Sequence, residues 1–526
     1  MKQINKFCLL PVLFIVMITS WSCKKNFNDL NQNTNKPTAV PPYLLVTGIL
    51  NDMVDYPTGD YDHWDQYFLI NYDYYGNNRY DFGSGASYYT DLKNVTKMEE
   101  QAKAIGLPDV NPYEAMAKFF RAYYFTKMSL EMGDIPMTEA LQGINNLTPV
   151  YDPQKEVFKQ AFLWLDSANN DLATLVAAGT NTLGGDIDFG GDLLQWQKAI
   201  NSFRLRLLIN LSKKTGDADL GIASQFSSVV SNPAKYPLFE NSDDNLQYTY
   251  VHPTNDYPEN PGNFGFNALR ENCSATYLGL LTSLKDPRTF LTAEPATALV
   301  AAGKSATDFS AFVGADPGED LGSMYAKANA GQYSLINRYR YYNTYTGEPT
   351  IIIGYAEQCF NIAEAINRGW ITAGPKGDAE SYYKAGIQAS MASYGIPASG
   401  TMAVYFLHPG ASLGTYDSYN VNVDFNSYYA QSTVAYANGA TGLTQILQQK
   451  YLAMFRHSGL EAYFQFRRTG VPAFTTGAGT GNSGRIALRF QYPSNEITTN
   501  TANYQSALKD QYNGNDDING KMWLLQ

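Results

Sequence analysis

The sequence predicts a mostly α protein, built from stacked helical hairpins with irregular, loop-rich segments inserted between them. The strongest evidence is the segment Pro112–Leu141, in which apolar side chains recur at helical spacing until Gly133 and Pro136 end the pattern. Such a thickly apolar helix cannot bury its surface alone. Three later segments have the same pattern, which favours helical pairs packed on one another.

The composition limits the kinds of partner that the protein can bind. The chain has 526 residues, of which 44% are hydrophobic and only 17% are charged, and it contains 40 tyrosines. An aromatic, weakly charged composition is typical of surface proteins that bind neutral ligands. The net charge of -11 argues against binding to nucleic acid or to an anionic membrane surface, because both require a basic footprint. Cys273 and Cys359 are too few for a disulfide framework and are expected to be buried thiols.

The N-terminus has the pattern of an exported protein. Two lysines precede the apolar run Phe7–Ile18, which is too short to span a membrane in the mature protein and is followed by small residues before Cys23. This resembles a bacterial lipoprotein signal peptide over residues 1–22, with the lipid carried by Cys23, although Ser20 stands where the common motif has Leu. The alternative is an ordinary secretory signal with an incidental cysteine. Residues 23–40 are expected to form a flexible tether.

The remainder, residues 41–526, is expected to be a single helical body. His63–Ile70 is predicted to be a buried helix, and Asp152 is predicted to cap the helix that follows it. Helical periodicity fades in two segments, which are interpreted as insertions at about 217–350 and 396–440.

Several motifs carry a resemblance to a known family. They are GDIPMTEAL at Gly133–Leu141, YDPQKEVFKQAFLWLDSA at Tyr151–Ala168, WQKAINSFRLRLLINL at Trp196–Leu211, DPR at Asp286–Arg288, YAEQCFNIAEA at Tyr355–Ala365, QQKYLAMF at Gln448–Phe455 and EAYFQFRRTG at Glu461–Gly470. In this order, and together with the leader that ends at Cys23, they resemble the SusD-like subgroup of the SusD/RagB outer-membrane lipoproteins.

The resemblance implies a tetratricopeptide-like helical core with irregular insertions, no enzyme activity and no cofactor. It also implies a lipid-anchored, surface-exposed protein of the outer membrane, seated over a TonB-dependent SusC-like transporter. There the protein would capture a glycan, or in some members of the family a peptide, and close the transporter as a lid. The matching motifs belong to the scaffold, so they identify no ligand-binding residue.

The best candidate for binding a glycan is the loop Tyr72–Tyr89, which mixes aromatic with polar side chains. Aromatic rings stack on the apolar C–H faces of sugar rings, and polar side chains bind the hydroxyl groups around them. The candidate residues are Tyr74, Tyr75, Asn77, Asn78, Arg79, Tyr80 and Asp81. By position in the family, Tyr341 and Tyr342 of the segment Asn337–Tyr342 form a second candidate group. The alternative is that these tyrosines pack the loops onto the helices or face the transporter.

Three patterns that suggest catalysis or metal binding are weak. Gly410–Gly414 matches G-x-S-x-G, but no helix follows it, and Asp424 and His457 come too soon after it for an α/β-hydrolase. Asp186 and Asp188 are sequence neighbours of a kind that is usually a solvated turn, not a glycosidase pair across a cleft. The four histidines have no zinc-site spacing, so no metal site is predicted.

Two acidic residues on one helix face suggest buried ion pairs. Glu357 and Glu364 lie seven residues apart, beside apolar side chains, and are predicted to pair with Arg467 or Arg468.

The sequence thus favours non-catalytic capture of a glycan and its delivery to a partner transporter. A peptide ligand on the same scaffold is the first alternative, which the low content of charged residues disfavours. A surface glycosidase or esterase would need Ser412, or a carboxylate pair, in a deep cleft. A purely structural lid would lack exposed aromatic rings.

Overall fold

A computed structural model describes residues 39–526 of the chain except 58, 73–76, 180–181 and 458. No helix within this described part is long and apolar enough to cross a membrane.

The described helices and strands all belong to the unit Pro42–Gln526. The predicted signal peptide and lipidation site, residues 1–22 and Cys23, lie outside the described residues.

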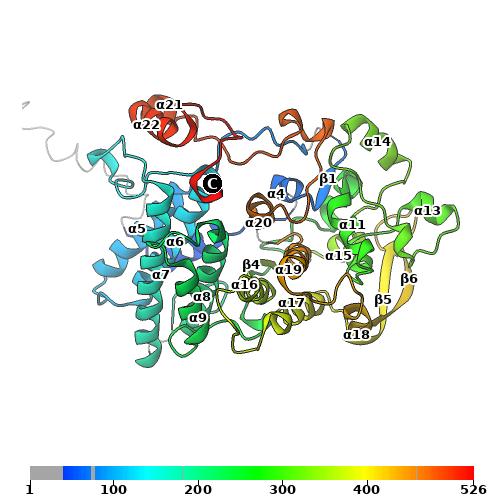
Figure 1. Ribbon diagram of the computed structural model, residues 1–526, viewed down its shortest axis with the longest axis horizontal. Helices are drawn as coiled ribbons and strands as arrows, with labels where there is room; N and C mark the ends of the chain where they lie inside the picture. Colours follow the sequence, from blue (N-terminus) through cyan, green and yellow to red (C-terminus); the bar gives the residue numbers. More distant parts are fainter. Residues whose placement is uncertain (1–38, 58, 73–76, 180–181, 458) are drawn as a thin grey trace, which may run out of the picture. The chain divides into compact units, whose positions relative to one another are not determined.

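Helices that pack on one another in sequence form the body of the unit Pro42–Gln526 (Figure 1). α3 packs against α5, α5 against α6, α6 against α7, and α7 against α8, which also contacts α9 and α16; α16 in turn packs against α17 and α19. The predicted mostly α, tetratricopeptide-like fold is confirmed. These helices are α3 (Pro42–Asp52), α5 (Tyr89–Ala104), α6 (Pro112–Met132), α7 (Gln154–Ala177), α8 (Leu193–Asn210), α9 (Ile222–Ser231), α16 (Tyr355–Asn367), α17 (Ala379–Ser393), α19 (Gly439–Ala453) and α20 (Glu461–Thr469).

α6 is the predicted central helix, and 16 of its 21 residues are buried. The Asn111 side chain caps its first turn by accepting hydrogen bonds from the N–H groups of Tyr113 (2.9 Å) and Glu114 (3.1 Å). The helix ends at Gly133, whose φ of 100° is open to glycine but strained for other residues. A side chain there would also overlap the hydroxyl of Tyr512, so this position requires glycine for two reasons.

Short antiparallel strand pairs join segments that are far apart in the sequence. β1 (Phe68–Ile70) pairs with β3 (Glu271–Cys273), β2 (Leu246–Tyr248) with β4 (Thr350–Ile353), and β5 (Ser399–Leu407) with β6 (Tyr416–Asp424). The prediction of a buried helix over His63–Ile70 is therefore wrong in its second half. α4 (Asp60–Trp64) ends early because Gln66 has a φ of 55°, and the chain then enters β1.

The segments interpreted as insertions contain short helices and the β5–β6 hairpin (Figure 1). Apart from α9, which packs on α8, their helices are α10 (Phe264–Asn267), α11 (Ala275–Ser283), α12 (Thr289–Thr292), α13 (Thr297–Ala301), α14 (Leu321–Asn329), α15 (Arg338–Tyr342) and α18 (Phe425–Tyr429). The C-terminal segment adds α21 (Glu496–Thr499) and α22 (Thr501–Tyr512).

Asp152 does not cap α7, as the sequence predicted. Its carboxylate accepts hydrogen bonds from the N–H groups of Met137 (2.8 Å) and Thr138 (2.9 Å), and Pro153 precedes the helix instead. Asp152 therefore fixes the loop between α6 and α7.

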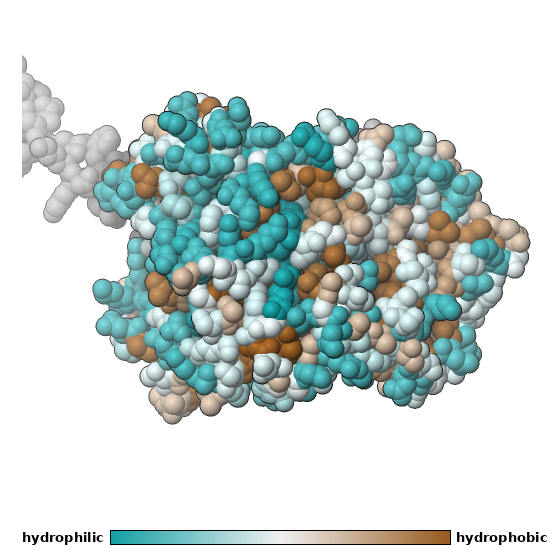
Figure 2. Space-filling model, in the orientation of Figure 1, coloured by the Kyte–Doolittle hydropathy of each residue, from teal (hydrophilic) through white to brown (hydrophobic). Residues whose placement is uncertain are grey.

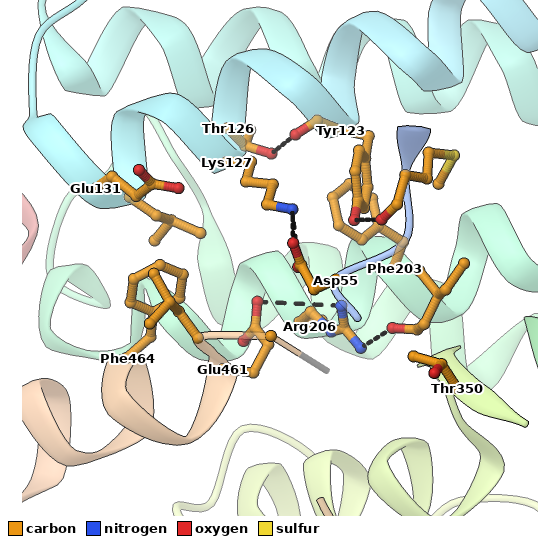
Figure 3. A pocket seen from close by; sticks show the side chains of 15 residues that line it. Asp55, Tyr123, Thr126, Lys127, Glu131, Phe203, Arg206, Thr350, Glu461 and Phe464 are labelled. Carbon is orange, nitrogen blue, oxygen red and sulfur yellow. Dashed lines mark hydrogen bonds and ion pairs between the residues drawn. The ribbon is translucent and has the colours of Figure 1, made fainter. Parts of the chain in front are cut away.

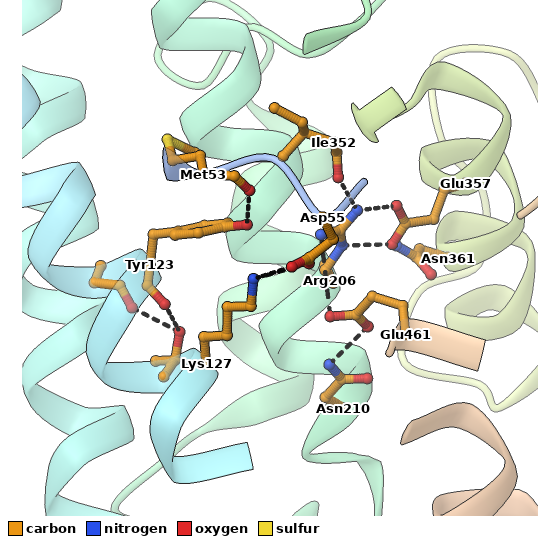
Figure 4. A network of polar contacts seen from close by, with 12 residues as sticks. Met53, Asp55, Tyr123, Lys127, Arg206, Asn210, Ile352, Glu357, Asn361 and Glu461 are labelled. Atoms are coloured by element: carbon orange, nitrogen blue, oxygen red, sulfur yellow. Dashed lines mark hydrogen bonds and ion pairs between the residues drawn. The ribbon is translucent and has the colours of Figure 1, made fainter. Parts of the chain in front are cut away.

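Buried ion pairs connect the helical pairs, and one of the predicted pairs is confirmed. The carboxylate of Glu364 on α16 accepts hydrogen bonds from both terminal nitrogens of Arg468 on α20. Burial alone would raise the pKa of Glu364, but the attraction of Arg468 outweighs it and lowers the pKa to about 2. Glu357 instead pairs with Arg206 of α8, with Oε1 2.8 Å from Nε (Figure 4). The prediction of an arginine from the 467–468 segment was wrong for Glu357.

We expect Glu364→Gln to destabilise the fold by about 3–5 kcal/mol at pH 7, because Arg468 would lose its charge partner in a buried place. The pKa of Glu364 is depressed in the folded state, so its contribution is fully present above the unfolded pKa near 4.5 and is lost as pH falls toward 2. Urea unfolding at pH 7 and at pH 3 measures this. The difference in unfolding free energy between wild type and variant should be smaller at pH 3 than at pH 7.

Glu100→Gln is the matched control, because its pair with Lys97 is exposed on a helix surface. We expect Glu100→Gln to lower the free energy of unfolding by less than about 1 kcal/mol. Equal costs for the two substitutions would contradict a special contribution from the buried pair.

Candidate functional site

A partly open cavity beside α6 is one place where a ligand could bind (Figure 3). Its lining includes Asp55, Lys127, Glu131 and Arg206, and Lys127 Nζ lies 2.8 Å from the Asp55 carboxylate. The free space is only ≈ 30 Å³, which is enough for about one or two water molecules. Burial raises the pKa of Glu131 to about 7, against the opposing hydrogen bond from the Ala86 N–H. This cavity is part of the packing of the body and is too small for a sugar.

The sequence pattern G-x-S-x-G does not form a catalytic site. Ser412 lies in the turn between β5 and β6, and the chain continues as a strand, not as the helix of a nucleophile elbow. His408 lies 3.1 Å from Asp417, on the next strand of the same hairpin. The pair is exposed and belongs to the hairpin.

Of the two neighbouring carboxylates at 186 and 188, Asp186 has a structural role, and neither is simply solvated as the sequence suggested. Asp186 accepts hydrogen bonds from the N–H groups of Asp188 (2.9 Å) and Gly191 (2.8 Å) and from the indole of Trp196 (2.8 Å). Burial and the nearby Asp186 raise the pKa of Asp188 to about 8. Asp186 thus organises the turn before α8.

Two residues of the predicted glycan loop pack it onto the body. The Asn78 side chain exchanges two hydrogen bonds with the backbone of Ile70, at 2.9 and 2.8 Å, and so extends the pairing of β1. Tyr80 is fully buried, and its hydroxyl donates to the carbonyl of Trp64. Neither side chain is presented to a ligand, since their hydrogen-bonding groups are used within the loop.

Tyr74 and Tyr75 lie outside the described residues. The other predicted residues of the loop are exposed: Asn77, Arg79 and Asp81.

Arg79 and Asp81 line an open polar pocket of ≈ 550 Å³ together with the glycine-rich segment 477–484. Arg79 Nε donates to Asp81 Oδ2 at 2.6 Å, and Asp81 Oδ1 accepts from the N–H of Asn482 at 2.6 Å. Gly481 has a φ of 60°, and a side chain there would overlap the Asp81 carboxylate. The pocket, named here the polar pocket, therefore depends on glycine at this position.

Two tyrosines and an arginine form a surface that the sequence did not identify. Arg270 lies over the ring of Tyr72, 4.1 Å from its centroid, and 6.0 Å from the ring of Tyr325 on α14. The two ring centroids are 5.9 Å apart with a 40° angle between planes, and the tyrosines are 37% and 39% exposed. We name Tyr72, Arg270 and Tyr325 the tyrosine platform.

Contacts within the fold bring the tyrosine platform and the polar pocket to the same region. Leu69 of β1 and Met324 of α14 share a small buried cluster, which fixes α14 beside the strand that leads to Tyr72 (Figure 1). The N–H of Gly479, from the segment that lines the polar pocket, donates to the carbonyl of Gly318, just before α14. Tyr72 and Arg79 also belong to the same loop, Tyr72–Tyr89.

The second predicted group is buried. Tyr341 and Tyr342 have no exposed surface, because α15 turns them toward the body while Arg338 pairs with the buried Glu294. The ring on the outer side of α15 is Tyr339.

Tyr339 stacks on Tyr405 of β5 with ring centroids 4.5 Å apart and meets Tyr416 edge to face at 5.0 Å. In this segment the tyrosine that reaches the surface is therefore Tyr339, and not the predicted Tyr341 or Tyr342. Tyr339, Tyr405 and Tyr416 are named here the hairpin triad.

Sequence reasoning missed Tyr325 and Arg270 because they lie about 200 to 250 residues from the predicted loop. Tyr325 stands on a short helix with one buried residue, Met324, so its exposed position follows from helical geometry. Its pairing with Tyr72 needs the tertiary structure.

Comparison with known proteins identifies the family. The chain is similar to two SusD homologues from Bacteroides fragilis. The first is 31% identical with a TM-score of 0.80, and the match covers 93% of this chain and 100% of the homologue. The second is 30% identical with a TM-score of 0.76, and the match covers 93% of this chain and 99% of the homologue. A chitin-binding SusD homologue from Flavobacterium johnsoniae shares the fold at 20% identity, with a TM-score of 0.67 over 92% of this chain and 98% of that one. No curated protein sequence matches the chain.

A family model described as starch-binding and associating with the outer membrane matches residues 34–493. The proteins of this family are binding proteins, and the chain is not an enzyme. The motifs quoted from the sequence therefore indicated the right family: the chain belongs to the SusD-like family of outer-membrane-associated proteins.

Proposed function

We propose that the protein captures a neutral glycan at the tyrosine platform and the adjoining polar pocket, and passes it to a TonB-dependent SusC-like transporter. The observation that carries the proposal is the pair of half-exposed rings, Tyr72 and Tyr325. The hydrogen bond from Gly479 to Gly318 brings the segment ahead of α14, which carries Tyr325, to the segment that lines an open pocket of polar groups. Sugar rings stack their C–H faces on tyrosine, and their hydroxyls bind carboxylate, guanidinium and backbone groups.

The geometry of the platform favours a bent glycan. The two rings are tilted by 40°, so two successive sugar units that stack on them must be rotated relative to each other. A flat, ribbon-like chain would present both units in one plane. The starch-binding description of the family is consistent with a chain of the bent kind.

The polar pocket suits uncharged hydroxyl groups. Arg79 and Asp81 neutralise each other, so the pocket presents directed donors and acceptors without a net charge. The glycine-rich segment 477–484 leaves backbone close to the pocket surface. The net charge of -11 over the chain also suits a neutral ligand better than an anionic one.

Delivery requires that the protein stay at the membrane. We propose that the lipid on Cys23 holds the folded body there, with the segment after it as a tether. The transporter then receives the glycan from the captured state, and no catalytic step is involved.

We expect the double substitution Tyr72→Ala/Tyr325→Ala to weaken glycan binding about 10- to 100-fold, because each ring contributes about 0.5–1.5 kcal/mol of stacking beyond area burial. Isothermal titration calorimetry of the chain that begins after Cys23, with starch and malto-oligosaccharides and then other glycans and peptides, measures this.

Tyr43→Ala is the control for the double substitution, because Tyr43 is a comparably exposed tyrosine (46%) on α3. Undiminished binding in the double variant would place the site elsewhere, and absence of binding to every ligand would favour a lid without its own affinity.

Gly481→Ala is expected to weaken glycan binding at least tenfold and also to lower the thermal unfolding midpoint, because a φ of 60° with a ψ of -153° is strained for alanine. The new methyl group would overlap the Asp81 carboxylate, so Arg79 and Asp81 would have to move. Gly484→Ala is the matched control, since Gly484 also has a positive φ (72°) but a methyl group added there would meet no atom within 4 Å. Equal affinities for the two variants would exclude the polar pocket from the binding site.

A further inference from the structure

Two buried carboxyl groups meet behind the strand that follows Arg270. Glu271 of β3 is 7% exposed and Glu259 is 2% exposed, and their side chains are hydrogen-bonded to each other. No other N–H or O–H group in the described part of the chain donates a hydrogen bond to Glu271 Oε2 or to either oxygen of Glu259. Ionised carboxylates only accept hydrogen bonds, so a bond between the two requires a proton on one of them. The pair therefore shares one proton.

One buried arginine balances the charge of the pair. Arg456 Nη2 lies 2.8 Å from Glu259 Oε2, and both side chains are buried. Asp62 on α4 adds a further acidic group that acts on both Arg456 and Glu271. The other titratable side chains of the described residues around the pair and Arg456 are His63 on α4, Tyr257, Tyr342 on α15 and Cys273 on β3.

The proton belongs on Glu271 at neutral pH. Burial and the adjacent Glu259 carboxylate raise the pKa of Glu271 well above its usual value, and Arg456 lowers it by less. On the face of the molecule in Figure 2, hydrophobic residues gather over the region of α4 and β1, which keeps the surroundings apolar. If the proton leaves to solvent, two carboxylates face one guanidinium in a buried place, and they repel each other.

The strand pair that contains Glu271 also positions the tyrosine platform. Glu271 lies opposite Ile70 in the pairing of β3 with β1. Just beyond this pair, the N–H of Asn71 donates to the carbonyl of Arg270 (2.9 Å). The next residue of the first segment is Tyr72, whose ring lies under the Arg270 guanidinium. Repulsion between Glu271 and Glu259 would therefore displace the backbone that brings Arg270 to Tyr72.

We propose that Glu271 is a positioning residue for the tyrosine platform, which holds the platform together while it shares a proton with Glu259 and releases the glycan when that proton is lost at higher pH. The release of glycan rests on the proposed function of the platform. The shared proton and its effect on the pairing of β1 with β3 do not depend on it.

Urea unfolding of the chain that begins after Cys23 tests the shared proton without a ligand. The unfolded chain releases the Glu271 proton near pH 4.5, whereas the folded protein keeps it, so stability falls as pH rises from there toward the raised pKa. Between pH 5.5 and 7.5 the folding equilibrium constant of wild type should fall about tenfold per pH unit relative to that of Glu271→Gln, which corresponds to one proton. Glu259→Gln should remove the same pH dependence, because Glu271 is then the one carboxylate for Arg456.

Glu294→Gln is the matched control, because Glu294 is a buried carboxylate paired with Arg338. It should lower stability and keep the pH dependence of wild type. Groups elsewhere in the chain that titrate in this range contribute equally to all the variants. The same pH dependence in wild type and in Glu271→Gln would overturn the shared proton, and so would an equal change in Glu294→Gln.

Hydrogen exchange and glycan titration test the coupling to the platform. Between pH 6 and 9.5 the protection factor of the Asn71 N–H should fall at least tenfold in wild type and stay within twofold in Glu271→Gln, whose amide donates to Glu259 at every pH. The affinity for malto-oligosaccharide, measured by calorimetry over the same range, should follow the same pattern.

A protection factor that does not change with pH in wild type would overturn the positioning role, as would an affinity that falls equally in wild type and in Glu271→Gln. If wild type binds no glycan at any pH, the proposed glycan site fails. The exchange of Asn71 then still decides whether the strand pair responds to the proton, so the two failures are distinguishable.

Discussion

The burial of α6 is the constraint on which the rest of the structure depends. A helix with 16 of 21 residues buried must be covered on several sides, and α5, α7 and the C-terminal segment provide that cover. Gly133 ends the helix where Tyr512 of α22 lies against it, so the C-terminal segment returns to a helix formed early in the chain. Ion pairs such as Glu364–Arg468 then join the later helical pairs to one another.

A scaffold fixed in this way can carry irregular loops without losing its fold. The tyrosine platform combines Tyr72 from the first loop, Arg270 from near β3 and Tyr325 from α14. The short pairing of β1 with β3 and the packing of Leu69 on Met324 hold these three segments together. The binding surface therefore arises from loops whose positions are set by small strand pairs, while the helices supply stability.

Local patterns predicted the helical scaffold well, because periodicity and end signals act within a few residues. The helix at Pro112–Met132 and the pair Glu364–Arg468 could both be derived from the sequence. Features that depend on residues far away in the sequence could not be derived from it. Ile70 pairs with Glu271 in a strand and is not part of a helix, and Glu357 finds Arg206 on a helix that lies about 150 residues earlier.

The candidate site shows the same division. An aromatic loop could be recognised as a surface candidate from composition, but which of its rings face outward could not. Tyr80, Tyr341 and Tyr342 are buried because their loops pack on the body, while Tyr325, in a different segment, is exposed. Sequence composition shows that the chain has many tyrosines, whereas tertiary packing decides which of their rings are exposed to a ligand.

The most direct test of the proposed capture of a glycan is a crystal structure of the chain that begins after Cys23 with a bound malto-oligosaccharide. We expect sugar rings stacked on Tyr72 and Tyr325, with hydroxyl groups at hydrogen-bond distance, about 2.7–3.0 Å, from groups of the polar pocket. Sugar bound instead at the hairpin triad of Tyr339, Tyr405 and Tyr416 would contradict the proposed site.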